Sequence, residues 1–519
     1  MSNLKYWEDK IKQKRKNTDF REFVKEIASW SPIILYKNQW KVSRYNEKIK
    51  RVSCIDNNNY NSNYESINAG SSFDFDFSDN FFANFNKTYS SYKFPFTYVF
   101  PWLWVENCEF SDVTHASKNV YLSFFTTTWS ENVLYSYSTK QSSKNVLNSI
   151  SIGKNSENIY LSSFCLQSYN IFYSYNIHNS SNIWFSSNLI WCSECLLCNW
   201  LENMSYCINN KQYEKKEYLE LKKSIITIKE KFNENFEYVR KNTPINFLSL
   251  NSSGYCLYNS EDINNSLFCW NLKNGNNSIL IFSEEWVFNS YDSILWWSWN
   301  TNNIVWQIWS WLCENIYLSI QCWTCNSTYY SLFLENCSFC LWCIWLKNKS
   351  YCILNKQYTK EEWYELADKI FSQMESEGTL WEFFPWEINP FYFNDTMAYL
   401  IDDSFTKEEV EKQWNMWRDE EIKVDIPEWV DVIKTTPPAR ASLPPQLRGT
   451  EGEFVSDYQW YDSNWNWQIN PEILKKVIKD EKWNIYRIVQ MEYDFLMKHW
   501  LPLPEIHWLD RIKMWFKFK

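Results

Sequence analysis

The chain has 519 residues, a formal net charge of −10 and a pI near 5.3. This length predicts about three or four domains, and the acidic balance argues against a general electrostatic surface for nucleic acid. The N-terminus is charged and has no apolar core, and no stretch reaches the ~18 apolar residues of a membrane span. We therefore expect a cytoplasmic protein with no membrane span, whose sixteen cysteines are reduced.

The first 104 residues form an N-terminal region that begins with short amphipathic segments. Phe73–Phe77 alternates apolar and acidic residues, which predicts a strand with one apolar face. Asp74 and Asp76 would then lie on the same side and could act as paired carboxylates. Because neither a histidine nor a third acid accompanies them, we favour a solvated strand face.

Residues 105–210 repeat the phrase Ser-x-Asn-(Val/Ile)-x-x-Ser with a short and nearly constant period. Its runs of Val, Ile, Tyr and Ser suit short strands, and units this short must stack to bury their apolar side. We predict a β-solenoid in which stacked asparagine amides form a ladder. The Asn slots are Asn107, Asn119, Asn132, Asn145, Asn158, Asn170 and Asn182. Whether one unit makes a full coil or half a coil stays open.

A second solenoid is predicted over residues 245–357. Ser350–Tyr358 repeats Ser205–Tyr213 at an offset of 145 residues, although the coils before Ile304 are less regular. Residues 211–244, between the two solenoids, carry an apolar stripe typical of an amphipathic helix. This helix either packs on the solenoid or binds a partner.

The rest of the chain is predicted to be helical and then α+β. Thr359–Glu362 and Thr406–Glu409 are capping boxes that open helices within the segment 358–434. Residues 435–454 are a Pro-rich linker, and residues 455–519 form a small α+β unit that includes a helix beginning at Asn470. The fold class is mainly β with helical appendages, comprising two tandem β-solenoids and a small C-terminal α+β unit.

The cysteines allow three interpretations. Some have zinc-like spacing and are weak metal candidates: Cys322, Cys325, Cys337, Cys340 and Cys343. Cysteines also recur at the coil period, as buried small apolar residues would: Cys195, Cys207, Cys313, Cys325, Cys337, Cys340 and Cys352. We favour a structural cysteine stack inside the coils over zinc binding, and zinc binding over disulfide or redox chemistry. No metal or cofactor is expected.

No catalytic constellation emerges. The four histidines, His115, His178, His499 and His507, belong to no hydrolytic or metal motif, and no phosphate loop is present. Solenoid polysaccharide lyases and hydrolases need acids clustered on one face, whereas these coils present Asn and Ser. We expect no enzyme, and a carbohydrate-active solenoid enzyme is one alternative.

Tryptophan is in excess and glycine is scarce, at 33 and 7 residues. Many tryptophans stand at turns, as in Gln39-Trp40-Lys41 and Lys482-Trp483-Asn484, where glycine is the usual residue. Our hypothesis is that many of these codons, which we take to be UGA, are read as glycine in the source cell.

Several phrases resemble a family of Cys-rich coil and zinc-ribbon proteins from uncultured, reduced-genome bacteria. They are Ser350–Glu362, Glu382–Pro385, Phe75–Phe82 and Leu501–Pro504. The resemblance implies zinc ribbons flanking Cys-rich coils, with no known activity, and UGA is reassigned to glycine among such bacteria. This chain departs from the family, because Asn57 stands where relatives have the second cysteine after Cys54, and no cysteine precedes the tail phrase. The N-terminal region is therefore interpreted as a degenerate zinc ribbon.

Taken together, these patterns favour an intracellular structural or interaction scaffold whose solenoid surfaces bind a macromolecular partner, with a protein favoured. The first alternative is an RNA- or ribosome-associated protein descended from zinc-ribbon ancestors, which the net charge does not support.

Overall fold

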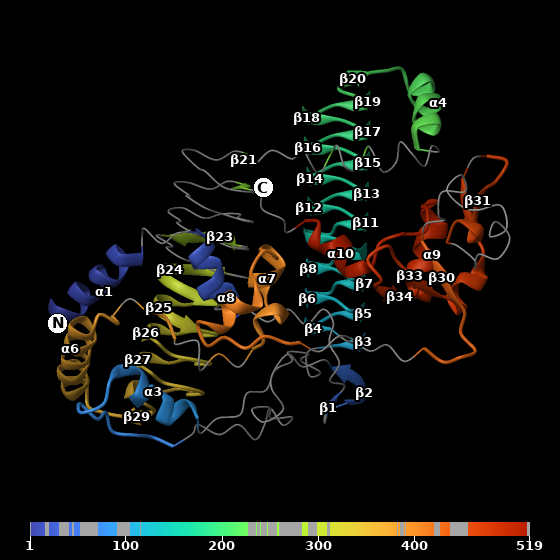
Figure 1. The fold of residues 1–519 in the computed structure, drawn as a ribbon. Helices are drawn as coiled ribbons and strands as arrows, with labels where there is room; N and C mark the ends of the chain where they lie inside the picture. The colour runs from blue at the N-terminus through green and yellow to red at the C-terminus, as the bar shows by residue number, and fades with distance from the viewer. Residues whose placement is uncertain are drawn as a thin grey trace.

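The computed structural model covers residues 1–519. The parts that it describes are residues 2–15, 20–30, 41–43, 46–51, 71–90, 104–109, 111–114, 116–226, 235, 239, 246–247, 257–258, 283–288, 298–308, 312–380, 382–384, 389, 391–419, 426–435, 455–464 and 466–515. Two stacks of short strands dominate the fold, and helices from both ends of the chain lie against them (Figure 1).

Residues 106–212 form a β-solenoid with two sheets. The odd-numbered strands from β3 to β19, together with β20, build a ten-stranded sheet. The even-numbered strands from β4 to β18 build an eight-stranded sheet. The strands are β3 (Glu106–Glu109), β4 (Asp112–Thr114), β5 (Lys118–Tyr121), β6 (Phe124–Thr126), β7 (Glu131–Leu134), β8 (Tyr137–Thr139), β9 (Lys144–Leu147), β10 (Ile150–Gly153), β11 (Glu157–Tyr160), β12 (Ser163–Leu166), β13 (Tyr169–Phe172), β14 (Tyr175–His178), β15 (Ser181–Trp184), β16 (Ser187–Ile190), β17 (Ser193–Leu196), β18 (Asn199–Glu202), β19 (Ser205–Ile208) and β20 (Lys211–Gln212).

Each repeat unit is one full coil, which answers the question that the sequence left open. Glu157 of β11 pairs in parallel with Lys144 of β9 and with Tyr169 of β13, its counterparts one coil before and one coil after. The even-numbered strand between them lies in the other sheet. One coil therefore contributes one rung to each sheet.

The backbone turns a corner every three residues. From Ala116 to Asn210 a residue with φ between 43° and 63° recurs at every third position. In three coils an extra left-handed residue directly follows a corner residue, and each of these coils is one residue longer than the others. The extra residues are Trp129, Ser142 and Asn155. Left-handed backbone favours Asn among non-glycine residues, so the Asn slots meet a conformational demand of the corner.

The inward positions between corners form columns. One column consists of Val120, Val133, Val146, Ile159, Ile171 and Ile183, all with no exposed surface. A neighbouring column is serine, and each hydroxyl accepts the backbone N–H of the serine one coil later, as in Ser149 N to Ser136 Oγ at 3.2 Å. The phrase Ser-x-Asn-(Val/Ile)-x-x-Ser thus encodes two inward columns and one corner.

The duplicated phrase that begins Ser-Tyr-Cys-Ile ends each stack. β20 folds back antiparallel on β19, and β29 (Lys356–Gln357) folds back on β28 (Ser350–Ile353). The Asn210 amide donates to Asn199 O at 2.8 Å and accepts from Asn199 N at 2.8 Å. Asn355 bonds Ile344 in the same way. These amides satisfy backbone groups of the previous coil that a further rung would otherwise pair.

The second stack is a seven-stranded sheet that includes β29. Its other strands are β23 (Ser283–Phe288), β24 (Ser298–Ile308), β25 (Glu314–Ile320), β26 (Asn326–Tyr329), β27 (Ser338–Leu341) and β28, and the pair β21 (Asn246–Phe247) and β22 (Leu257–Tyr258) precedes it. From β24 to β28 the parallel register advances by the same step at every rung, as from Glu314 to Asn326 to Ser338. This stack is the less regular one, since β23 meets β24 with a register shift.

Helices and a small unit complete the described chain. They comprise α1 (Ser2–Arg15), α2 (Phe20–Phe23), η1 (Val24–Ala28), β1 (Lys41–Ser43), β2 (Asn46–Arg51), α3 (Phe81–Tyr89), α4 (Lys215–Ile226), α6 (Lys360–Glu377), η5 (Phe393–Asp395), α7 (Met397–Ile401), α8 (Lys407–Glu411), β30 (Val432–Lys434), η7 (Val455–Tyr458), β31 (Gln459–Tyr461), β32 (Trp467–Ile469), η8 (Pro471–Lys475), β33 (Val477–Lys479), β34 (Ile485–Tyr486), α9 (Gln490–His499) and α10 (Trp508–Lys513). Both capping boxes are N-caps: Thr359 accepts from Glu362 N, and Thr406 accepts from Glu409 N.

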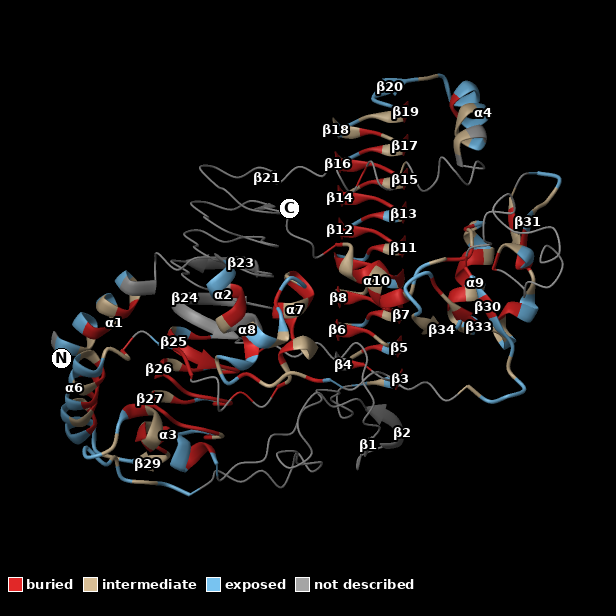
Figure 2. Cartoon of the chain, viewed as in Figure 1, coloured by how far each residue is buried: buried red, intermediate tan, exposed pale blue. Residues whose placement is uncertain are grey.

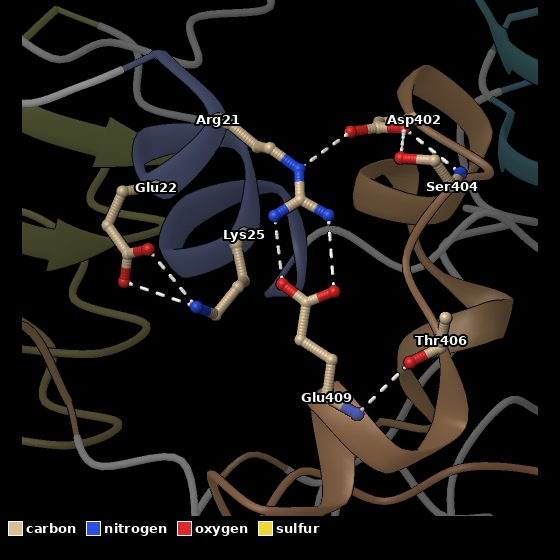
Figure 3. Close-up of polar contacts among 7 residues, drawn as sticks. All are labelled: Arg21, Glu22, Lys25, Asp402, Ser404, Thr406 and Glu409. Atoms are coloured by element: carbon tan, nitrogen blue, oxygen red, sulfur yellow. Dashed lines mark hydrogen bonds and ion pairs between the residues drawn. The ribbon is translucent and has the colours of Figure 1, made fainter.

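The strands of the first solenoid are largely buried along its length, whereas α4 at its end is mostly exposed (Figure 2). Helix α2 is bonded to the segment 391–419, whereas α1 is bonded to α6 through Trp7–Asp368 and Lys10–Glu375. The Arg21 guanidinium makes a bidentate contact with the Glu409 carboxylate, through Nη1–Oε1 at 2.8 Å and Nη2–Oε2 at 3.2 Å. Its Nε donates to Asp402 Oδ2 at 3.3 Å (Figure 3). The residues nearest the N-terminus therefore pack against elements that lie far along the chain.

Local predictions were wrong at two places. Phe73–Phe77 forms no strand: Phe73 N–H donates to Leu354 O at 3.1 Å, so this extended segment covers the end of the second stack. Asp74 forms an ion pair with Lys356, and Asp76 Oδ1 accepts the backbone N–H of Ser78. The two carboxylates therefore have separate partners. The helix expected from Asn470 is the single 3₁₀ turn η8, and β30 joins the C-terminal sheet beside β33.

Nine tryptophans of the described chain have left-handed backbone, and most of these are exposed. They are Trp104, Trp129, Trp191, Trp200, Trp342, Trp345, Trp414, Trp483 and Trp500. Trp500 is the left-handed C-cap of α9, with φ 52° and ψ 48°, a position at which helices usually carry glycine. A bulky side chain in this conformation costs about 1–2 kcal/mol.

We predict that Trp414→Gly and Trp500→Gly each raise the free energy of unfolding by ~1 kcal/mol, because glycine relieves the left-handed strain. Trp363→Gly is the matched control: Trp363 is fully buried in α6 and donates to Cys352 O at 3.2 Å. It should lose at least ~3–5 kcal/mol. Urea unfolding measures all three, and destabilisation by the first two substitutions would contradict the prediction.

Candidate binding site

The seven Asn slots lie in one column on the outside of the ten-stranded sheet. Each Nδ2 donates to Oδ1 of the next asparagine, from Asn107 to Asn182, at 2.8–3.1 Å. The column ends at Glu194, which takes the corresponding slot in the next coil. The ladder is a rigid polar edge that leads to the end of the solenoid.

The thirteen cysteines of the described chain line the inside of the coils. Cys195 lies opposite Cys207 on adjacent rungs, and Cys340 lies opposite Cys352. Cys325 N–H donates to Cys313 Sγ at 3.3 Å, one coil apart. The weak metal candidates, including Cys322, Cys337 and Cys343, are buried, and none of them is in a disulfide within the described chain. Among the described residues, no group of three or more His, Cys, Asp or Glu is placed to hold a metal ion.

Neighbouring thiols near the end of the first solenoid shift one another's pKa. A hydrogen bond with Cys195 lowers the pKa of Cys192 to about 7, and the same contact raises the pKa of Cys195. Burial raises the pKa of Cys165. These groups face the interior of the solenoid, so they shape its core and do not line an open surface.

Three histidines lie in three different surroundings, and His115 is outside the described residues. Burial lowers the pKa of His178 to about 3, and His178 Nε2 lies 2.7 Å from Asn176 Oδ1. Burial also lowers the pKa of His499 and of His507 to about 4. His507 Nδ1 accepts Leu509 N–H at 3.2 Å and so caps α10.

The C-terminal unit docks on the ten-stranded face of the first solenoid. The ring of Trp508 stacks on Tyr135 with centroids 5.1 Å apart, and Phe495 stacks on Tyr160 at 5.8 Å. Behind these rings Arg511 Nη1 donates to Glu492 Oε1 at 2.8 Å, and both side chains are buried. Removing one partner of such a desolvated pair destabilises the fold, because the remaining charge would be buried without a partner.

A cleft of about 350 Å³ lies where the solenoid, α4 and the C-terminal unit meet. Its lining consists of Asn170, Phe172, Asn182, Trp184, Glu194, Leu219, Lys222, Lys223, Asn466, Trp467, Lys498, His499 and Trp500. This volume lies within the usual range for ligand sites. The cleft starts at the upper end of the asparagine ladder.

The cleft combines an apolar floor with a cationic rim. Phe172 is buried, and the His499 ring lies 5.3 Å from it. Lys222 Nζ bonds Glu194 Oε2 at 2.8 Å. Lys223 and Lys498 also line the cleft, and both are exposed. Three lysines against one glutamate favour a ligand that offers acidic groups and an apolar anchor.

The asparagines of this site were singled out in the sequence, but the cleft was not. Its walls come from three segments that are far apart in the chain, so no spacing rule joins them. One signal was available: the second copy has Ala367 and Asp368 where α4 has Lys222 and Lys223. The aligned helices differ at other positions too, such as Lys216 against Glu361, so this signal alone does not single out the residues that line the cleft.

Comparison with known proteins gives no match, whether to family models, to curated proteins or to solved structures. Within the described residues, none of the helices is long and apolar enough to cross a membrane.

Interrupting the ladder tests its contribution to stability. Asn145 has φ 53°, donates to Asn158 at 2.9 Å and accepts from Asn132 at 2.8 Å. Asn145→Gly removes the two bonds and keeps the corner, and should lose ~1–2 kcal/mol. Asn145→Ala also strains the corner, so it should lose ~1 kcal/mol more. Asn203→Gly, at an exposed corner, serves as the control in urea unfolding; an unchanged Asn145→Gly variant would refute the role of the ladder.

The buried histidine of α10 should make stability pH-dependent. Because the pKa of His507 falls to about 4 in the folded state against 6.5 when exposed, the unfolded chain binds more protons between these values. The free energy of unfolding should therefore be highest above pH 6.5, and it should fall by up to about 3 kcal/mol through this histidine as the pH falls towards 4. His507→Asn keeps a capping acceptor and cannot titrate. Its free energy of unfolding should fall less than that of the wild type from pH 7 to pH 4.5; parallel curves would contradict this.

Proposed function

We propose that this protein is an intracellular interaction scaffold, whose first solenoid, α4 and C-terminal unit together bind a protein partner. The observation that carries the proposal is the cleft of about 350 Å³ where these three parts meet. Its walls are held in place by buried contacts, including the Arg511–Glu492 pair and the ring stacks on Tyr135 and Tyr160. A preorganised concave surface loses little conformational entropy when a partner binds.

The lining favours binding over chemistry. Glu194, the only carboxylate among the described lining residues, is paired with Lys222, and burial keeps His499 neutral at physiological pH. Glycoside hydrolysis would need two carboxylates flanking one bond. We therefore propose a protein without enzymatic activity and without a cofactor, in which the cysteines serve the solenoid core.

An RNA- or ribosome-associated role is the second candidate, and Lys222, Lys223 and Lys498 are the observation that favours it. Three lysines at one rim could contact phosphates, although the chain carries a net charge of −10. A protein partner with acidic side chains accounts for the same lysines without requiring a basic surface elsewhere.

We also propose that tryptophans in left-handed conformation are glycine in the source cell. The support is the agreement between the scarcity of glycine and the backbone of residues such as Trp129 and Trp483. Peptide mass spectrometry of the protein isolated from its natural source tests this. Tryptophan found at these positions would end the proposal.

The scaffold proposal is tested by purifying the tagged full-length chain from its natural host, with and without nuclease treatment. We expect a stoichiometric protein partner that survives nuclease and cross-links to lysines of the first solenoid and α4, such as Lys144 and Lys223. Loss of the partner after nuclease treatment would favour the RNA role. Absence of a stoichiometric partner would overturn the scaffold.

A further inference from the structure

The internal duplication provides a reference for the cleft, because the corresponding place in the second copy is filled. The two copies align at an offset of 145 residues, and they keep the same contact between cap and helix. Tyr206 meets Tyr218 edge-on at 5.6 Å and 68°, and Tyr351 meets Trp363 edge-on at 6.3 Å and 68°. α4 and α6 therefore leave their stacks in the same way.

Helix α1 fills this place in the second copy. Tyr329 OH donates to Glu8 Oε1 at 2.6 Å, Lys12 Nζ lies 5.7 Å from the centre of the Tyr317 ring, and Trp7 Nε1 donates to Asp368 at 2.8 Å. Lys10 pairs with Glu375 of α6. Ile11, with no exposed surface, is the apolar anchor.

Three residues of the second copy that contact α1 align with residues of the first copy that line the cleft. Tyr317, Tyr329 and Asp368 correspond to Phe172, Trp184 and Lys223, and all three of these line it. Further lining residues, Glu194, Leu219 and Lys222, correspond to Phe339, Tyr364 and Ala367. α9 reaches Phe172 through His499 and ends there, which leaves the cleft between α9 and α4.

The charge at this place differs between the copies at one aligned position: Asp368 of α6 corresponds to Lys223 of α4, whereas Glu375 corresponds to Glu230. α6 presents Asp368 and Glu375 to α1, and α1 has five basic and two acidic residues. The first copy instead presents Lys223 of α4 and Lys498 of α9. A second copy of this chain would bring its basic α1 to a basic rim, so charge complementarity argues against self-association at this site.

We propose that the cleft is a seat for an acidic amphipathic helix of a partner protein, which inserts an aliphatic side chain over Phe172 and sets its acids against Lys223 and Lys498. The inference rests on the proposed scaffold function and names the chemistry of its partner. Helix-in-groove recognition of this kind needs an apolar anchor and a matching charged edge, and the cleft supplies both.

The test uses two labelled peptides and the full-length chain in fluorescence anisotropy. One peptide has the sequence of residues 2–15; the other is the same sequence with its five basic residues replaced by glutamate. We expect the acidic peptide to bind saturably and at least tenfold more tightly than the native α1 peptide. Lys223→Glu and Lys498→Glu should each weaken the acidic peptide at least fivefold and strengthen the native α1 peptide.

Lys216→Glu is the matched control, since Lys216 is an exposed lysine of α4 outside the cleft lining. It should leave both affinities unchanged, and circular dichroism and the Tm confirm that the variants are folded. Equal binding of both peptides, or no effect of the two cleft substitutions, would overturn the proposal. Tight binding of an oligouridine probe that the same substitutions abolish would assign the cleft to nucleic acid. If the peptides fail while a natural partner still cross-links to the first solenoid, the scaffold stands and only the seat is refuted.

Discussion

The fold depends on hydrogen bonding from each coil to the next at a nearly constant spacing along the chain. Each rung can pair only if the backbone returns to the same place after one coil, and it does so by turning left-handed corners at every third residue. Left-handed backbone is unfavourable for most side chains, so the pairing of rungs, the serine column and the buried Val/Ile column must together exceed this strain. The strain explains why Asn recurs at one corner, where its amide also bonds the next coil.

The same constraint decides what the sequence could reveal. A strict repeat period predicts stacked rungs, because any large departure from it would break the register, and the fold class followed from it. The Asn slots could be predicted as a column for the same reason. Phe73–Phe77 misled us because alternation describes a segment with one buried face, whether or not that face belongs to a strand; here it covers the end of a stack.

The candidate site could not be found in this way. The cleft joins β13, β15, α4, β32 and α9, and their meeting depends on where the C-terminal unit docks. That docking is set by ring stacking and by one buried ion pair, neither of which leaves a periodic trace in the sequence. The comparison of the two duplicated blocks carried partial information: Ala367 against Lys222 falls in the cleft, but Glu361 against Lys216 falls outside it.

Duplication also shows how one architecture can be closed in one copy and open in the other. In the second copy α1 covers the seat beside α6, and Phe75 packs on Trp342 near the end of the stack. In the first copy the C-terminal unit covers Tyr135 and Tyr160 and stops at Phe172, so the last coils and α4 keep an accessible wall. The end cap follows the same pattern in both, which means that the difference arises from what is docked and not from the solenoid itself. Under the proposed function, the rigid part is copied, one copy keeps its covering helix, and the wall of the other copy presents Lys222 and Lys223 to a partner of opposite charge.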